Sequence, residues 1–154
     1  MARFTGTVLL LVLAIVCCSA QTGSFKAIAR GGFQYLGNDG EATGAISGEI
    51  RSGKNSFADF MFVLKDPGGA TRDGQGEAVV FLKSVSRSVL TGNRLVVTGR
   101  GTFQGATQEI EVTFIDGLRR SEIDQVRVRV LRSGQVLFDQ SARLAFDAVT
   151  ISRQ

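Results

Sequence analysis

Acidic side chains near predicted loops are the residues of this chain whose positions best suggest chemistry. Asp116 and Asp124 flank a polar loop that also contains Glu122, and Asp139 follows further along the chain. Calcium binds six to eight oxygens, and carboxylates gathered on loops between strands supply such ligands. Asp-Gly is also ordinary turn chemistry, and the spacing matches no calcium-loop motif. Asp116, Asp124 and Asp139 are therefore a candidate calcium site, with turn formation as the alternative, and no other cofactor is expected.

A second pair of carboxylates, Asp59 and Glu77, could act as in a glycosidase. That reaction needs two carboxyl groups roughly 5–9.5 Å apart across a sugar-binding cleft. Such clefts usually offer aromatic platforms, whereas this chain has no tryptophan and one tyrosine. It also has no histidine, and its two cysteines, Cys17 and Cys18, lie in the N-terminal apolar segment. Because the usual nucleophile–base pairs are missing, no catalytic residue is assigned, and we expect a protein that is not an enzyme.

Basic residues form two small groups that could contact a sulfated or carboxylated glycan. Lys83 and Arg87 lie among serines in one stretch, and Arg119 and Arg120 are adjacent in the polar loop. A solvated face is the alternative, because the net charge is only +4 and the charges are interspersed. The Gly99–Gly101 segment lies in a predicted strand with no following helix, so it is not a dinucleotide-binding motif. We expect no nucleic-acid partner.

The N-terminus has the features of a secretory signal peptide. Arg3 gives a short positive start, Val8–Val16 is an unbroken apolar run, and small residues precede a cleavage point after Ala20. The run is too short to span a bilayer comfortably, although a retained anchor is the alternative. We therefore expect cleavage after Ala20 and a secreted, extracellular protein of residues 21–154. This protein would have no cysteine, no disulfide and no membrane contact.

The clearest structural signal is a period-two alternation on both sides of the polar loop. Apolar residues at 110, 112 and 114, and at 126, 128 and 130, alternate with polar ones, as in half-buried strands. We predict a hairpin in which Phe114 lies opposite Val126 and Glu111 lies opposite Arg129. A slip of one residue would invert every side chain, so the register is well specified.

The rest of residues 21–154 shows further strand patterns and no convincing helical stripe. We predict strands over 24–36, 42–50, 57–65, 77–84, 89–90, 94–103, 135–139 and 143–151, with an irregular loop over 66–76. Turns rich in Gly, Asn and Asp at this spacing are typical of a β-sandwich or a jelly-roll-like barrel. No linker or break in composition is present. We therefore predict one all-β, antiparallel β-sandwich domain over residues 21–154.

An ordered series of segments adds a resemblance. The segments are Ala58–Val63, Gly99–Gly101, Val112–Gly117, Asp124–Val130 and Gly134–Asp139. Over about residues 45–140, the series resembles a module found near the ends of large bacterial secreted and cell-surface proteins. That module has the pattern ANFGFV, GxGxING, VTxxDG, DxFRIRIW and GxVVYD. This chain departs from it at Gln104–Ala106, which replaces the ING turn, at Val126, which replaces an aromatic residue, and after Val130, where no tryptophan follows. The resemblance implies an extracellular β module of surface or matrix architecture and assigns no catalytic residue.

Three classes of function fit these observations. The first is a non-catalytic extracellular structural, matrix or surface module. The second is a secreted binding protein that recognises a glycan or a protein through the loops Asp66–Gly76 and Asp116–Asp124. The third is a carboxylate-based hydrolase. We expect the first, with the second as the alternative. Self-assembly could use an open edge strand, for which Ala42–Ile50 and Arg143–Ile151 are the candidates.

Overall fold

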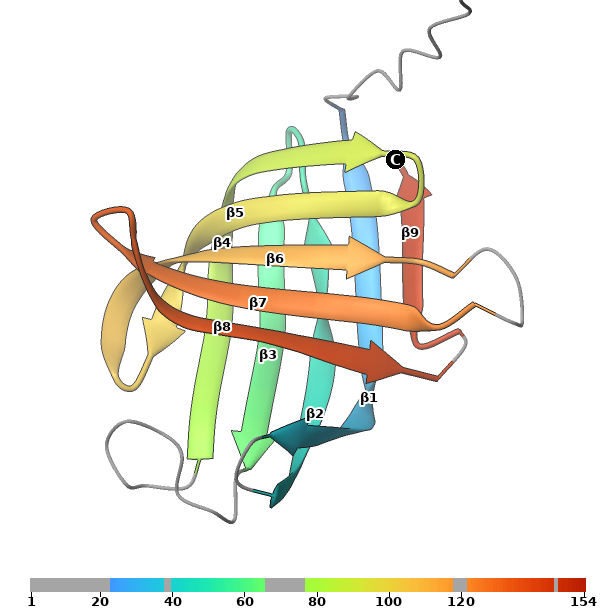
Figure 1. Ribbon diagram of the computed structural model, residues 1–154. Coiled ribbons are helices and arrows are strands. Elements are labelled where there is room, and N and C mark those ends of the chain that lie inside the picture. Colours follow the sequence, from blue (N-terminus) through green and yellow to red (C-terminus); the bar gives the residue numbers. More distant parts are fainter. Residues whose placement is uncertain (1–22, 38–39, 66–76, 118–121, 146) are drawn as a thin grey trace, which may run out of the picture.

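The computed structural model describes residues 23–37, 40–65, 77–117, 122–145 and 147–154 (Figure 1). The nine strands in these ranges are β1 (Phe25–Gly37), β2 (Gly40–Arg51), β3 (Phe57–Lys65), β4 (Glu77–Thr91), β5 (Arg94–Phe103), β6 (Ala106–Ile115), β7 (Asp124–Arg132), β8 (Gln135–Leu144) and β9 (Val149–Arg153). The predicted signal peptide and the predicted loop over 66–76 lie outside the described residues. Within the described ranges, no helix has the length and apolar character needed to cross a membrane.

All nine strands form one antiparallel sheet in the order β8-β7-β6-β5-β4-β3-β2-β1-β9. Strands that follow one another along the chain are neighbours, except that β9 pairs with β1. The sheet curls strongly into a half-barrel: β1, β2, β3 and β9 form a first wall, β5 to β8 form a second wall that crosses it, and β4 runs through both (Figure 1). The predicted all-β antiparallel fold is confirmed. The predicted two-sheet sandwich or jelly roll is wrong.

Strand β4 is the reason for this difference. Its sequence pattern predicts two elements, at 77–84 and 89–90, whereas the structure has a single strand of 15 residues. The register against β5 shifts between Leu82 and Ser84, and again between Val85 and Arg87. A β-bulge bends a strand and interrupts its alternation without ending its pairing. The two bulges carry the sheet from the first wall into the second, so one sheet encloses the core.

The core lies between the two walls and is rich in phenylalanine. Phe60 of β3 meets Phe114 of β6 edge to face, with ring centroids 5.5 Å apart. Phe62 of β3 lies 6.0 Å from Phe138 of β8. These contacts join strands that are far apart in the order of the sheet, so burial of the apolar faces holds the curl.

The β6–β7 hairpin has the predicted register. Phe114 lies opposite Val126 and Glu111 lies opposite Arg129, so that prediction is confirmed. The edge strands agree less well. Ala42–Ile50 is not an edge, because β2 pairs with both β1 and β3. Arg143–Ile151 is not one strand, because β8 continues to Leu144 and β9 begins at Val149. The edges of the described sheet are β8 and β9.

Candidate functional site

Six arginines lie on the outer surface of the second wall, and we call them the arginine face. They are Arg87 of β4, Arg94 and Arg100 of β5, Arg127 and Arg129 of β7, and Arg143 of β8. Successive side chains of a strand point to opposite faces. Because Leu95 and Val128 are buried in the core, their neighbours Arg94, Arg127 and Arg129 point outward. The ladder register aligns the other arginines with them.

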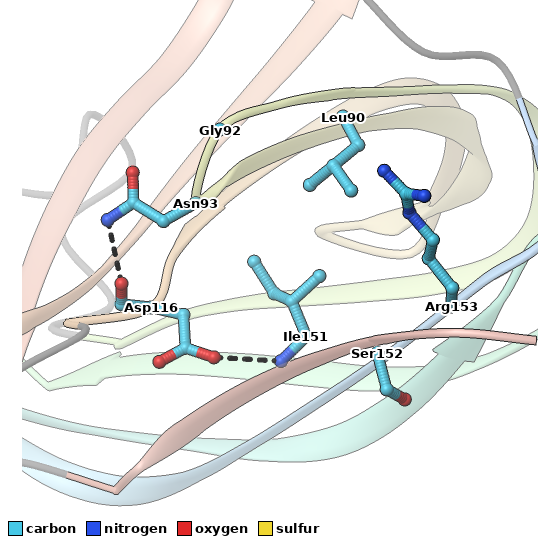
Figure 2. A pocket seen from close by; sticks show the side chains of 7 residues that line it. All are labelled: Leu90, Gly92, Asn93, Asp116, Ile151, Ser152 and Arg153. Carbon is cyan, nitrogen blue, oxygen red and sulfur yellow. Dashed lines mark hydrogen bonds between the residues drawn. The ribbon is translucent and has the colours of Figure 1, made fainter.

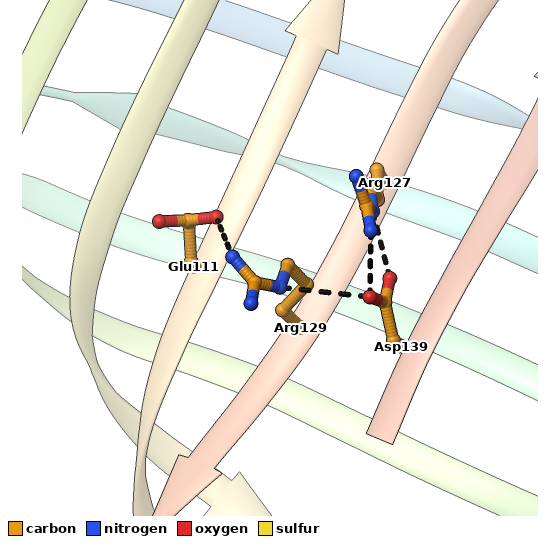
Figure 3. A network of polar contacts seen from close by, with 4 residues as sticks. All are labelled: Glu111, Arg127, Arg129 and Asp139. Atoms are coloured by element: carbon orange, nitrogen blue, oxygen red, sulfur yellow. Dashed lines mark hydrogen bonds and ion pairs between the residues drawn. The ribbon is translucent and has the colours of Figure 1, made fainter. Parts of the chain in front are cut away.

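Three carboxylates, those of Glu109, Glu111 and Asp139, share this surface, so the arginine face carries a net charge of +3. One ladder row crosses all five strands in the order Arg87, Thr98, Glu111, Arg129 and Asp139. Figure 3 shows that the Arg129 guanidinium lies between two of the acids. Its Nη1 donates to Glu111 Oε1 at 3.1 Å, and its Nε lies 3.6 Å from Asp139 Oδ2.

Arg127 holds Asp139 from the next row. Its Nε donates to Asp139 Oδ1 at 2.7 Å, and its Nη2 donates to Oδ2 at 2.6 Å (Figure 3). This paired hydrogen bond lowers the pKa of the Asp139 carboxyl below its ordinary value, so the acid stays ionised. Arg127 and Arg129 are thus neutralised by their own neighbours.

The remaining four arginines and Glu109, which lies opposite Arg100 in the ladder, account for the net charge of +3. Arg87, Arg94, Arg100 and Arg143 are exposed, and none of them has an ion-pair partner among the described residues. Their backbones are held in a paired sheet, so only the side chains have to be ordered when they bind an anion. This arrangement can bind sulfate or carboxylate groups from solution.

Of the four basic residues predicted from the sequence, the structure places only Arg87 on the arginine face. Lys83 is exposed at the first bulge of β4, between the Leu82–Gly101 and Ser84–Arg100 pairs, and is not one of the six arginines. Arg119 and Arg120 lie outside the described residues. Five members of the face were not singled out from the sequence. For two of them the sequence does indicate an outward position, because Arg127 and Arg129 alternate with valines that the pattern predicts to be buried. The others come together only through the pairing of five strands.

The two aspartates that flank the β6–β7 loop hold strand β9. Asp124 is fully buried; its Oδ1 accepts the Gly117 N–H at 2.7 Å, and its Oδ2 accepts the Val149 N–H at 2.7 Å. Oδ2 of Asp116 accepts the Ile151 N–H at 3.1 Å. Since Val149 and Ile151 are alternate residues of β9, these carboxylates bond the side of β9 that faces away from β1. These hydrogen bonds connect the free edge of β9 to the adjoining ends of β6 and β7, where no backbone ladder closes the half-barrel. We call this place the seam.

The candidate calcium ligands are therefore only partly brought together. Asp116 and Asp124 lie near one another, whereas Asp139 lies on the arginine face beside Arg127. No three acidic side chains of the described residues form a group that could hold a metal ion. Asp116 and Asp124 accept hydrogen bonds from backbone amides. This is a structural role, as in the alternative that these acids shape turns and bind no metal. Calcium binding by the three aspartates stays a prediction.

An open pocket of about 240 Å³ lies beside Asp116 at the seam (Figure 2). It is lined by Leu90, Gly92, Asn93, Asp116, Ile151, Ser152 and Arg153. Nδ2 of Asn93 donates to the backbone oxygen of Asp116 at 2.7 Å. Burial raises the pKa of the Asp116 carboxyl; the Ile151 amide opposes this, and the charges of Asp124 and Asp147 add to it. Asp116 is the one carboxylate among the described lining residues, so this pocket offers no glycosidase pair.

Replacement of Asp116 by asparagine tests this raised pKa. A carboxyl whose folded-state pKa lies above its ordinary 3.8 stabilises the fold when protonated, and this contribution is lost as the pH rises through the folded-state pKa. Asparagine does not ionise, so the stability of Asp116→Asn relative to wild type should rise between about pH 3 and about pH 7. Urea denaturation at the two pH values measures this difference. A relative fall would show that the pKa of Asp116 is lowered instead.

The other carboxylate pair is too far apart for glycoside hydrolysis. Asp59 lies opposite Glu49 on β2, and Glu77 lies opposite Lys65 on β3. Asp59 and Lys65 are six residues apart on the same strand, which corresponds to about 20 Å. The separation exceeds the roughly 5–9.5 Å that the reaction needs, so the hypothesis that these two acids form a catalytic pair is wrong.

Comparisons with protein-family models, with curated proteins and with solved structures found no match. The function is therefore inferred from the chain's own residues and their geometry.

Proposed function

We propose that this protein is a non-catalytic extracellular module that binds an acidic polysaccharide through the arginine face. The observation that carries the proposal is the set of four exposed arginines without ion-pair partners among the described residues, on an outer sheet surface of net positive charge. Guanidinium groups bind sulfate and carboxylate groups with paired N–H donors and remain charged at any physiological pH.

The spacing of these arginines favours a polymer over a small ligand. Arg94 and Arg100 are six residues apart on β5, which corresponds to about 20 Å. Arg94 and Arg143 lie in one ladder row, separated by Ile115 and Gln125, and three strand spacings correspond to about 14 Å. The charges are spread over a surface and do not converge on one point. A chain with repeated anionic groups can contact several of them at once.

Two features of the sequence support the extracellular part of the proposal. The N-terminus has the charge, the apolar run and the cleavage point of a signal peptide. The resemblance to a module of bacterial surface proteins also implies a role in surface or matrix architecture. A module that attaches to an acidic polymer would serve such a role without catalysis.

The proposal is tested by binding to heparin, as a sulfated probe, and to alginate, as a carboxylated probe, with neutral dextran as the blank. The variant Arg94→Gln/Arg100→Gln/Arg143→Gln should bind the preferred acidic polymer about tenfold or more weakly, because three contacts are lost. The slope of log Kd against log salt concentration should fall by about one for each lost contact. Isothermal titration at several salt concentrations measures both quantities.

A matched control removes three positive charges from the other side of the molecule. Arg30, Arg51 and Lys54 are exposed residues of the first wall and its turn, and their replacement by glutamine should leave the affinity nearly unchanged. Equal losses in both variants would mean that only net charge matters and would contradict a site on the arginine face. Absence of binding to either acidic polymer at low salt would refute the proposed function.

A further inference from the structure

The first wall of the half-barrel carries an apolar patch on its outer face. Met61 and Val63 of β3 lie opposite Phe81 and Val79 of β4 in alternate rows of the ladder. Phe81 is 38% exposed, and the other three side chains are half-buried. These residues alternate along their strands with core residues such as Phe62 and Val80, which are fully buried. The patch therefore points away from the core, and we call these four residues the outer patch.

Four charged residues frame the outer patch with alternating sign. Lys65 and Glu77 form the ladder pair at one end. At the other end, Asp59 and Lys83 lie next to the Phe60–Leu82 pair. All four are exposed, and no ion pair joins any of them to another described residue. On β3 the negative charge stands at the Asp59 end, whereas on β4 it stands at the opposite, Glu77 end.

We propose that the outer patch is a self-association surface, on which a second copy of this chain packs face to face. A closed dimer uses the same surface on both subunits, so the charge pattern must be complementary to itself. With a twofold axis along the strands, Asp59 of one copy faces Lys83 of the other, and Lys65 faces Glu77. With an axis across the strands, Asp59 faces Lys65, and Glu77 faces Lys83.

Under either axis every corner of the frame meets an opposite charge, and the four apolar side chains meet their counterparts. Such complementarity selects a partner, because like charges placed together oppose binding. A second copy of this chain supplies the matching pattern by symmetry. An apolar surface with a polar rim is also typical of protein interaction sites.

The size of the outer patch sets the strength of the contact. A stable complex buries about 800 Å² on each partner, and four side chains with their charged frame form a smaller surface. We therefore expect a reversible dimer that forms at high protein concentration. In such a dimer the two arginine faces point away from each other, on the outer sides of the pair. The dimer itself does not depend on polymer binding.

Sedimentation equilibrium from about 10 μM to about 1 mM protein at low salt should show the average mass rising from that of the monomer toward that of the dimer. Asp59→Lys places like charges together under either axis and should weaken association at least tenfold. Phe81→Ser should also weaken it, because less apolar surface is buried. The control Glu109→Lys makes the same change of charge on the arginine face and should leave association unchanged.

Two double variants identify the axis. Asp59→Lys/Lys83→Asp restores the opposite charges only if the axis runs along the strands, and Asp59→Lys/Lys65→Asp restores them only if it runs across the strands. One of the two should recover wild-type association. Because all these residues are exposed, circular dichroism should show the same β spectrum in each variant. A wild-type protein that stays monomeric throughout the range would overturn the proposal. So would an Asp59→Lys variant that associates normally, or folded double variants that both fail to recover.

Discussion

Replacement of Asp124 by alanine should lower the free energy of unfolding by about 2–6 kcal/mol. The carboxylate is fully buried and accepts the N–H groups of Gly117 and Val149, each at 2.7 Å. Alanine would leave both amides buried without partners, and each such group costs about 1–3 kcal/mol. The loss is large compared with the 5–15 kcal/mol that usually stabilises a domain. Urea denaturation followed by circular dichroism measures it.

Two further variants separate the bonds of Asp124 from the loss of an acid in general. Asp124→Asn keeps one acceptor oxygen but turns an amide group toward the second N–H, so its stability should lie between those of the wild type and Asp124→Ala. Asp139→Ala removes an exposed acid of the arginine face and should have a much smaller effect. If Asp124→Ala lost less than about 1 kcal/mol, water would have to replace the carboxylate at both amides.

Replacement of Gly101 by alanine should destabilise the protein by about 3 kcal/mol or more, at the upper end of what overpacking usually costs. A Cβ atom at this position would lie 1.7 Å from the backbone oxygen of Phe81 and 2.6 Å from Cδ1 of Ile110. Gly99 has the same constraint, since a Cβ there would lie 1.7 Å from the oxygen of Ser84. Both glycines face the bulged part of β4, whose bend pushes its carbonyl groups against β5. Chemical denaturation of Gly101→Ala measures the effect.

Gly32→Ala is the matched control, because it makes the same change in a strand that has room. The nearest atom to a Cβ at Gly32 is the oxygen of Gly44 at 3.6 Å, an ordinary contact. Its stability should stay the same or rise by about 0.4–1 kcal/mol, because alanine restricts the unfolded chain. Equal losses at Gly101 and Gly32 would show that lower strand flexibility, and not the close approach to β4, is responsible.

The strands themselves could largely be predicted from the sequence. Strand β3 and strand β5 have the predicted bounds, and the β6–β7 hairpin has the predicted register. Each depends on alternation within a short stretch or between two adjacent ones, and burial of one face enforces that pattern. The same signal fails over 84–88 in β4, because a bulge breaks the alternation that would reveal a continuous strand. The wrong prediction of a two-sheet sandwich follows from this stretch, because it was not recognised as part of one continuous strand.

The candidate sites were less predictable, because they combine residues that are distant in the sequence. Arg87 and Asp139 become ends of one ladder row only after five strands have paired. Asp124 was selected for its acidity as a calcium ligand, yet its position makes it the acceptor for an amide of β9, 25 residues later. Apolar residues lie on both faces of β3, a pattern typical of a strand covered on both sides, whereas the outer face of this strand belongs to the partly exposed outer patch.

By itself, the sequence determined that the described residues form an all-β domain, which segments are extended, and which side of the β6–β7 hairpin is buried. The physical reason is that a strand's two-residue period is a local property, and apolar alternation records it directly. Only the tertiary structure decided that the strands form one curled sheet, where β9 pairs, and which charges share a surface. Those features depend on bulges and on cumulative register across several strands, and no short stretch of residues contains that information.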